Sequence, residues 1–186
     1  MKLRMLLTAV VAAGLSLPAG ANTKGTPGTP TNADQELGAK LGHEVRMYPR
    51  YSIWDNIAFR VHEGDVELEG QVSQPFKKGD IERIARKTPG VRSVTNNLRV
   101  LPTSFFDDRL RRQVASAIYR DPMLSRYGMQ PLPPIHIIVD NGHVTLEGVV
   151  ANQTDSNVAA IRAQGAGLSF GQVTNNLRVE NPTVKK

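Results

Sequence analysis

The sequence contains no cysteine. This absence excludes a disulfide framework and the lipidated cysteine that anchors lipoproteins to a membrane. It also removes the ligand that most often completes a zinc site with histidine. Any stable fold must therefore depend on its packed core and on satisfied polar groups.

Long apolar runs are also scarce. The longest follows Lys2 and Arg4, extends from Met5 to Leu17, and precedes the small residues Ala19-Gly20-Ala21. Its length of about 13 residues is less than the roughly 20 that a membrane-spanning helix needs. A basic start, a short apolar run and an A-x-A site are typical of a cleaved export signal. We expect a signal peptide at 1–21, a periplasmic mature chain and no transmembrane span in that chain.

An excess of one charge is absent from the body of the chain, although the formal net charge is +6. Residues 34–103 carry 11 basic and 10 acidic residues, and residues 104–180 carry 7 of each. The surplus lies in the signal, in the segment 22–33 and in the basic tail 182–186. Because the body is nearly neutral and the chain is exported, we expect no nucleic-acid partner.

The chain contains an internal repeat. VHEGDVELEGQV (Val61–Val72) matches VDNGHVTLEGVV (Val139–Val150), and VTNNLRV occurs at both Val94–Val100 and Val173–Val179. Two matched blocks in the same order indicate a duplicated domain. We place the first copy at 34–103 and the second at 104–181, after a flexible Gly/Pro/Thr-rich linker at 22–33.

Each copy repeats one order of periodicities. An apolar helical stripe at i, i+4 and i+8 comes first, two alternating strands joined by a Gly-containing turn follow, and a short helix precedes the closing VTNNLRV strand. Ser104, three residues before Asp107, is typical of an N-cap for the first helix of the second copy. The sequence predicts an α+β chain of two tandem α-β-β-α-β domains. Each is expected to hold a three-stranded mixed sheet with two helices on one face.

These residues resemble the BON domain, a bacterial osmotic-stress and nodulation module of exported proteins. The resemblance rests on the α-β-β-α-β order and on the V-x-L-x-G-x-V and V-x-N-x-L-x-V strands at Val66–Val72, Val144–Val150, Val94–Val100 and Val173–Val179. It implies a non-catalytic module that associates with phospholipid surfaces or envelope proteins and supports envelope integrity under stress. Several relatives carry a lipidated cysteine that this chain lacks, which favours reversible membrane contact.

The sequence offers no catalytic constellation. The four histidines are not spaced as helical metal ligands and do not match between copies, so we expect no metal and no cofactor. Asp65, Glu67 and Glu69 alternate along one strand, and we interpret them as a solvated sheet face offset by basic neighbours. No nucleophile elbow, phosphate-binding loop or dinucleotide fingerprint is present.

Candidate binding residues occur where the copies differ. The second copy is about five residues longer between its first helix and first strand, where RDPMLSRYGMQPLPP combines apolar side chains with arginine. Such a loop suits a membrane interface, but it also suits a cap on the end of the sheet or a filling of the gap between the copies. The residues concerned are Met123, Leu124, Arg126, Tyr127, Met129 and Leu132.

A second candidate is the start of the same copy's first helix, SFFDDRLRRQVASAIY. Phe105 and Phe106 precede three arginines, Arg109, Arg111 and Arg112, which would attract an anionic phospholipid surface or an acidic envelope protein. The alternative is that the phenylalanines pack between the copies and the arginines pair with neighbouring aspartates.

The closing heptapeptide and the strand glycines are predicted to be structural. Alternation directs the Val and Leu side chains inward, so Asn96 and Asn175 are expected to lie partly inside and to hydrogen-bond backbone in a neighbouring loop or turn. Gly70 and Gly148 occupy matching positions in the second strand of each copy. We therefore predict a binding protein whose partner is an anionic phospholipid surface, with a protein-binding or chaperone-like role as the alternative.

Overall fold

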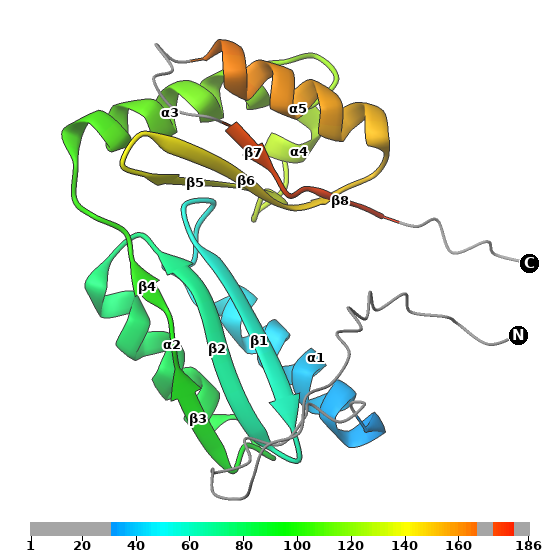
Figure 1. Ribbon diagram of the computed structural model, residues 1–186. Helices are drawn as coiled ribbons and strands as arrows, with labels where there is room; N and C mark the ends of the chain where they lie inside the picture. Colours follow the sequence, from blue (N-terminus) through cyan, green and yellow to red (C-terminus); the bar gives the residue numbers. More distant parts are fainter. Residues whose placement is uncertain (1–30, 167–172, 181–186) are drawn as a thin grey trace, which may run out of the picture.

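A computed structural model describes residues 31–166 and 173–180, and it contains two similar units in tandem (Figure 1). The predicted signal at 1–21, most of the linker and the tail at 182–186 lie outside the described residues. The first unit consists of α1 (Asn32–Met47), β1 (Asn56–His62), β2 (Asp65–Val72), α2 (Pro75–Lys87), β3 (Ser93–Asn96) and β4 (Arg99–Val100). The second consists of α3 (Phe105–Tyr119), α4 (Ser125–Gly128), β5 (Ile135–Asp140), β6 (His143–Val150), α5 (Gln153–Gly165), β7 (Val173–Asn175) and β8 (Arg178–Val179).

Each unit holds a mixed sheet. β1 pairs antiparallel with β2, and β2 pairs in parallel with both β3 and β4. The same relations join β5 to β6 and β6 to β7 and β8. Because β3 and β4 are successive halves of one strand, as are β7 and β8, the predicted three-stranded α+β arrangement is confirmed. The additional element is the single turn α4, which follows from the longer link of the second copy.

The closing strand of each unit is interrupted next to an asparagine, Asn96 in the first unit and Asn175 in the second, whose side chain bonds the backbone. Asn96 donates its Nδ2 to Lys78 O at 3.0 Å and accepts Leu98 N on its Oδ1 at 3.1 Å, so its side chain spans the interruption. Asn175 makes the equivalent bonds to Ser156 O and Leu177 N. Both side chains hydrogen-bond backbone as predicted, but the predicted location in a loop or turn is wrong, because the acceptor carbonyls belong to helices α2 and α5. Asn175 itself is exposed.

The last residue of this strand departs from the burial that alternation predicted. Val94 and Leu98 are buried, but Val100 is exposed. The register to β2 is the same on both sides of the break, since Val94 pairs with Val66 and Val100 with Val72. Val100 is therefore exposed as the end residue of the strand, and the pairing itself does not change.

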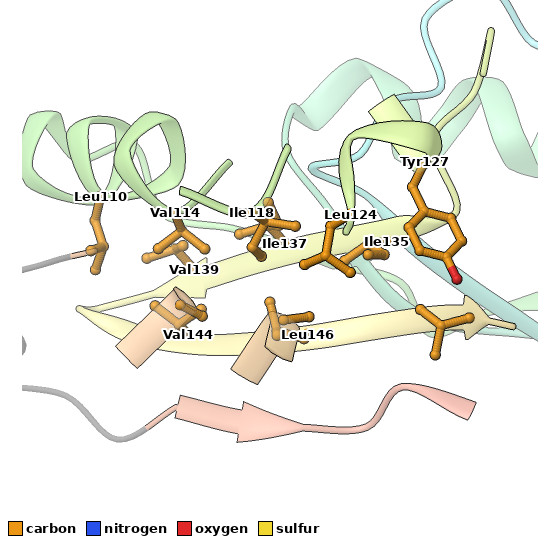
Figure 2. Close-up of a cluster of buried hydrophobic side chains, with 13 residues drawn as sticks. Leu110, Val114, Ile118, Leu124, Tyr127, Ile135, Ile137, Val139, Val144 and Leu146 are labelled. Carbon is orange, nitrogen blue, oxygen red and sulfur yellow. The ribbon is translucent and has the colours of Figure 1, made fainter. Parts of the chain in front are cut away.

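The core of the second unit lies between α3, α4, α5 and the sheet. Leu110, Val114 and Ile118 form the predicted stripe of α3 and face Ile137 and Val139 of β5 (Figure 2). α4 places two further side chains over the same strand, as described below. The first unit has its own core, centred on Leu41, Leu68 and Ile81.

Gly70 and Gly148 have the structural role that their matched positions predicted. Their φ angles are +114° and +118°, a region that residues with a Cβ seldom adopt. A Cβ added at Gly70 would collide with the carbonyl oxygen of Asn56, and one at Gly148 with that of Pro134. Both copies therefore need glycine here, because a backbone carbonyl lies directly against it. This carbonyl belongs to Asn56 at the start of β1 in the first copy and to Pro134, just before β5, in the second.

The two units are joined through the edge of β5. Ile137 N donates to Ile53 O of the first unit at 2.7 Å, and the Nδ1–H of His136 donates to Asp55 O at 2.6 Å. Trp54, between these two residues, packs against the core of the second unit. The two small copies are therefore in direct contact. This contact also covers an edge strand that would otherwise expose unpaired backbone.

A buried polar corner lies beneath this junction. Asp55 is fully buried and accepts Lys77 Nζ at 2.6 Å, Ser73 N at 2.7 Å and Ser52 N at 3.0 Å. Burial of an ion pair is tolerated when both partners are hydrogen-bonded in this way. The corner fixes the link 51–55, and therefore the segment that contacts β5.

Candidate functional site: the outer face of α3

The beginning of α3 is fixed by a cap that serves two elements. Ser104 Oγ accepts Asp107 N at 3.2 Å, which confirms the predicted N-cap. Asp107 is itself buried and accepts the backbone amides of Asn141 and Gly142 at 3.0 and 2.8 Å. A carboxylate in the first turn is favoured by the helix dipole, and here it also attaches the helix to the β5–β6 turn. The orientation of α3 on the sheet is thereby determined.

The face of α3 opposite the core combines arginine with an aromatic ring. Phe105, Arg109, Arg112 and Arg120 recur at spacings of three, four and eight residues, which places them along one side of the helix. Phe105 is 97% exposed, and all three arginines are exposed. Among the ion pairs of the described residues, none includes Arg109, Arg112 or Arg120. We call these four residues the α3 outer face.

Arg111 does not belong to this face, contrary to the sequence-based expectation of a three-arginine cluster. It is only 6% exposed and donates to Val139 O at 2.7 Å and to Asp108 Oδ1 at 2.5 Å. Its position on the helix lies beside the buried stripe, next to the edge of β5. It therefore satisfies a strand carbonyl, and its charge is compensated within the protein.

The two phenylalanines also have different environments. Phe106 is half exposed and lies against the β5–β6 turn, where its ring would contact a Cβ added at Gly142. Phe105 projects into solvent. The alternative of packing between the copies applies to neither ring, because Trp54 occupies that position.

The loop from Met123 to Leu132 is divided between core and surface. Leu124 is fully buried and Tyr127 is 5% exposed, and both side chains point from α4 toward the sheet (Figure 2). The Tyr127 hydroxyl donates to Asp155 Oδ2 at 2.5 Å and accepts Ala151 N at 2.9 Å. These two residues cap the sheet, so they are unavailable to a membrane and the interfacial interpretation is incorrect for them. Apolar type alone cannot show which side of a one-turn helix faces inward.

The remaining loop residues are accessible to different degrees. Met129 is 83% exposed and Met123 about half exposed. Arg126 is exposed but forms an ion pair with Asp155. Its Cζ lies over the Tyr127 ring, 5.1 Å from the ring centroid. Leu132 is partly buried and lines a groove beside β1. Only the two methionines remain as exposed apolar contacts of this loop.

A shallow groove that the sequence did not reveal continues the α3 outer face. It has a volume of about 600 Å³ and is lined by the end of α3, the link and α5, including Arg120, Pro122 and Ile161. Ile161 is 63% exposed. Arg162 beside it is paired with Asp121 at 2.6 Å. The position of Ile161, two residues from the buried Ala159 and Ala163, was the available signal that it faces outward.

The carboxylates of β2 are paired with arginine, as expected of a solvated sheet face. Arg92 contacts Asp65 at 2.6 Å and, with Ser93, lowers the pKa of that carboxyl to about 2. Arg60 reaches both Glu67 and Glu69. Within residues 31–166 and 173–180, no group of three acidic or histidine side chains is arranged to hold a metal ion. No described helix is long and apolar enough to cross a membrane.

A family model for the BON domain matches the chain twice, at residues 33–102 and 106–181. These matches cover both structural units. The chain is a tandem BON-domain protein. BON domains form a family of non-catalytic binding modules that are generally associated with membranes, phospholipid and stress, and their proteins are typically periplasmic or membrane-associated.

No curated protein matches this BON-domain chain. Among solved structures, it is similar to CdsD, a structural protein of the type III secretion system of Chlamydia trachomatis, with 15% identity and a TM-score of 0.30. That match covers 78% of this chain and 61% of the other, so the chain spans about three fifths of its length. The C-terminal domain of CdsD matches with 12% identity and a TM-score of 0.27, covering 77% and 96% of the two chains. TM-scores this low do not indicate a shared overall arrangement.

Proposed function

We propose that the second BON domain binds anionic phospholipid surfaces reversibly through the α3 outer face, and that this contact supports the integrity of the cell envelope under stress. The observation that carries the proposal is a 97% exposed Phe105 on the same side of α3 as three arginines that have no ion-pair partner in the described part of the chain. An exposed aromatic ring beside uncompensated guanidinium groups is suited to a headgroup layer, where ring and charge meet different environments.

The expected strength of this contact is modest. Each basic residue near an anionic surface contributes about 1 kcal/mol, and the contribution decreases over a Debye length as salt screens it. Three arginines and one ring therefore support association that is reversible and sensitive to salt. Ile161 lines the groove that continues the face and adds apolar area. The buried Arg111, Leu124 and Tyr127 contribute only by holding α3 and α4 in place.

The test uses the double variant Arg109→Glu/Arg120→Glu. Arg112 stays unchanged in this variant because it also lines a separate pocket. Loss of two attractive contacts of about 1 kcal/mol each predicts at least a roughly 30-fold weaker affinity for vesicles containing phosphatidylglycerol. Co-sedimentation at several salt concentrations measures the change.

The first domain supplies the matched control. Lys40 and Lys87 are exposed on α1 and at the end of α2, and Lys40→Glu/Lys87→Glu alters the net charge by the same amount. This control is expected to change vesicle binding by less than about threefold. Equal losses in the two variants would mean that net charge, and not the α3 outer face, governs binding.

A protein-binding or chaperone-like role is the second candidate, and one feature favours it. β1 is an edge strand, and it lines a groove of about 730 Å³ whose other walls include Leu132, Pro133 and Glu147 of the second domain. Extended peptides commonly add to such an edge. A partner recovered equally from native and delipidated envelope extract, and lost on mutation of β1 but not of α3, would support this role in place of the first.

The cellular site of action is proposed to be the periplasm. This rests on the export signal predicted at 1–21 and on the family's usual location. Mass spectrometry of the chain recovered from the producing cell tests the cleavage, with an N-terminus near Asn22 expected. A full-length chain retained in the cytoplasm would contradict the proposal.

A further inference from the structure

A second pocket, of about 360 Å³, lies where the two domains meet. Its walls come from four places in the chain. These are Trp54 in the first link, residues 73–74 between β2 and α2, residues 102–103 between the domains, and Arg111 and Arg112 on α3. A ligand in this pocket would touch both domains.

Arg111 carries an unsatisfied donor at this pocket. Its two terminal nitrogens are bonded to Val139 O and Asp108 Oδ1, but its Nε is buried and has no hydrogen-bond partner. Among the described residues, it is the one buried side-chain nitrogen or oxygen left without a partner. Such groups are rare in folded proteins, so this N–H calls for an acceptor.

The other walls favour an anion. Arg112 is exposed and forms no ion pair among the described residues, whereas Asp108 already has an oxygen engaged by Arg111. Two arginines and one aspartate leave one positive charge in excess. Gln74 is the N-cap of α2, a 13-residue helix whose N-terminus receives no hydrogen bond from the capping side chain. The positive end of the α2 dipole lies at this residue.

We propose that this pocket binds a small oxyanion, with a phosphate group as the best match. Guanidinium groups pair with phosphate through several hydrogen bonds in a fixed geometry. Trp54 and Pro102 supply an apolar wall suited to a glycerol or alkyl group attached to the phosphate. Free phosphate and the headgroup of a lipid share this chemistry. The site is separate from the α3 outer face except for Arg112, and it requires no membrane.

Trp54 is the only tryptophan in the sequence and lines the pocket, so it reports binding directly. Titration of the full chain with inorganic phosphate, at constant ionic strength set with chloride, should shift its fluorescence in a saturable manner. Glycerol phosphate and a short-chain soluble phosphatidylglycerol are then titrated in the same way. Tighter binding of inorganic phosphate assigns the site to a free anion, and tighter binding of the other two assigns it to a headgroup. A linear, non-saturating response to all three would overturn the proposal.

Two variants locate the effect. Arg112→Gln is expected to weaken phosphate binding at least tenfold, and because Arg112 is exposed the fold should persist, which circular dichroism checks. Arg109→Gln, three residues earlier and outside the pocket, should leave the titration unchanged. Equal responses of the two variants would contradict the site. Arg109→Glu/Arg120→Glu should lose vesicle binding but retain the phosphate response, so the membrane proposal and this one can fail separately.

Discussion

The two BON domains begin with helices that are capped by matching residue types, but these helices expose different surfaces. Thr31 and Asp34 at the start of α1 correspond to Ser104 and Asp107 at the start of α3, and in each pair the hydroxyl accepts the backbone amide of the aspartate. Only Asp34 returns a bond to the capping residue, because the Asp107 carboxylate accepts the amides of Asn141 and Gly142. When the helices are aligned by these caps, Arg109, Arg112 and Arg120 correspond to Glu36, Ala39 and Met47. The capping residue types are therefore matched in the two copies, and the basic face occurs only in the second.

A second difference lies inside. The third residue of α2 is Lys77, and the third residue of α5 is Asp155. Both are buried, but Lys77 pairs with Asp55 from the preceding link, whereas Asp155 accepts the hydroxyl of Tyr127 from α4. The same corner is thus closed with opposite charge. The negative charge of Asp155 is stabilised by the positive N-terminal end of α5. The positive charge of Lys77 is repelled by the corresponding end of α2, so it depends on its ion pair with Asp55.

Removing the partner of Asp55 is expected to have the largest effect on stability. Lys77→Met leaves a buried carboxylate without its counter-charge and should lower the free energy of unfolding by about 3–5 kcal/mol. Tyr127→Phe in the second domain removes hydrogen bonds but no charge, so about 1–3 kcal/mol is expected. Urea unfolding followed by circular dichroism measures both. A larger loss from Tyr127→Phe would contradict this account of the two corners.

The glycines test whether the two copies are equivalent at a shared position. Gly70→Ala and Gly148→Ala each force a Cβ into a carbonyl oxygen at positive φ, and each should cost about 3 kcal/mol. Gly79→Ala is the control, because a Cβ there meets no atom within 4 Å in the helix α2. It should stabilise the protein by up to about 1 kcal/mol. A loss in only one domain would break the equivalence.

Replacing the matched asparagines of the two copies should lower the free energy of unfolding by different but smaller amounts. Asn96 is partly buried and bonds to both Lys78 O and Glu82, so Asn96→Ala is expected to cost about 1–2 kcal/mol. Asn175 is exposed, where water can replace its partners, and Asn175→Ala should cost less than about 1 kcal/mol. Thermal unfolding of the two variants gives the order. The opposite order would refute the assignment of Asn96 as the stronger bridge.

The smallest expected effect is a pH dependence that belongs to the domain junction. Burial lowers the pKa of His136 from 6.5, although the Asp55 carbonyl and the Asp55 and Glu147 charges partly oppose this. The unfolded chain therefore binds a proton that the folded chain does not, and stability is lost as pH falls below about 6.5, by at most about 1.4 kcal/mol per pH unit.

His136→Gln should abolish this slope between pH 5 and 6.5, as measured by urea unfolding. His143→Gln, on the exposed start of the next strand, should keep it. The corresponding residue of the first domain is Ala58, so no equivalent slope is expected there. A slope that persists in His136→Gln would assign it to another group.

The sequence by itself determined the repeat, the order of elements and most of the core. The stripe of Leu110, Val114 and Ile118 is buried as its spacing predicted, because a helix on a sheet has one inward side whatever its neighbours are. The N-cap at Ser104 and the backbone bonds of the asparagines also followed from local rules. These features were predictable because they depend on contacts within one helix or strand, or between helices and strands whose order along the chain was already known.

Only the tertiary structure decided which charged and apolar residues are available to a partner. Arg111 looked like its neighbours in sequence, but it is buried and donates a hydrogen bond to Val139 O of β5. Leu124 and Tyr127 face inward because α4 packs over the sheet, and Asp55 is buried because Lys77 reaches it across 22 residues. Periodicity predicts which side of a helix faces the core. The exposure of residues that flank this side, such as Arg111, depends on which strand edge or link packs against them.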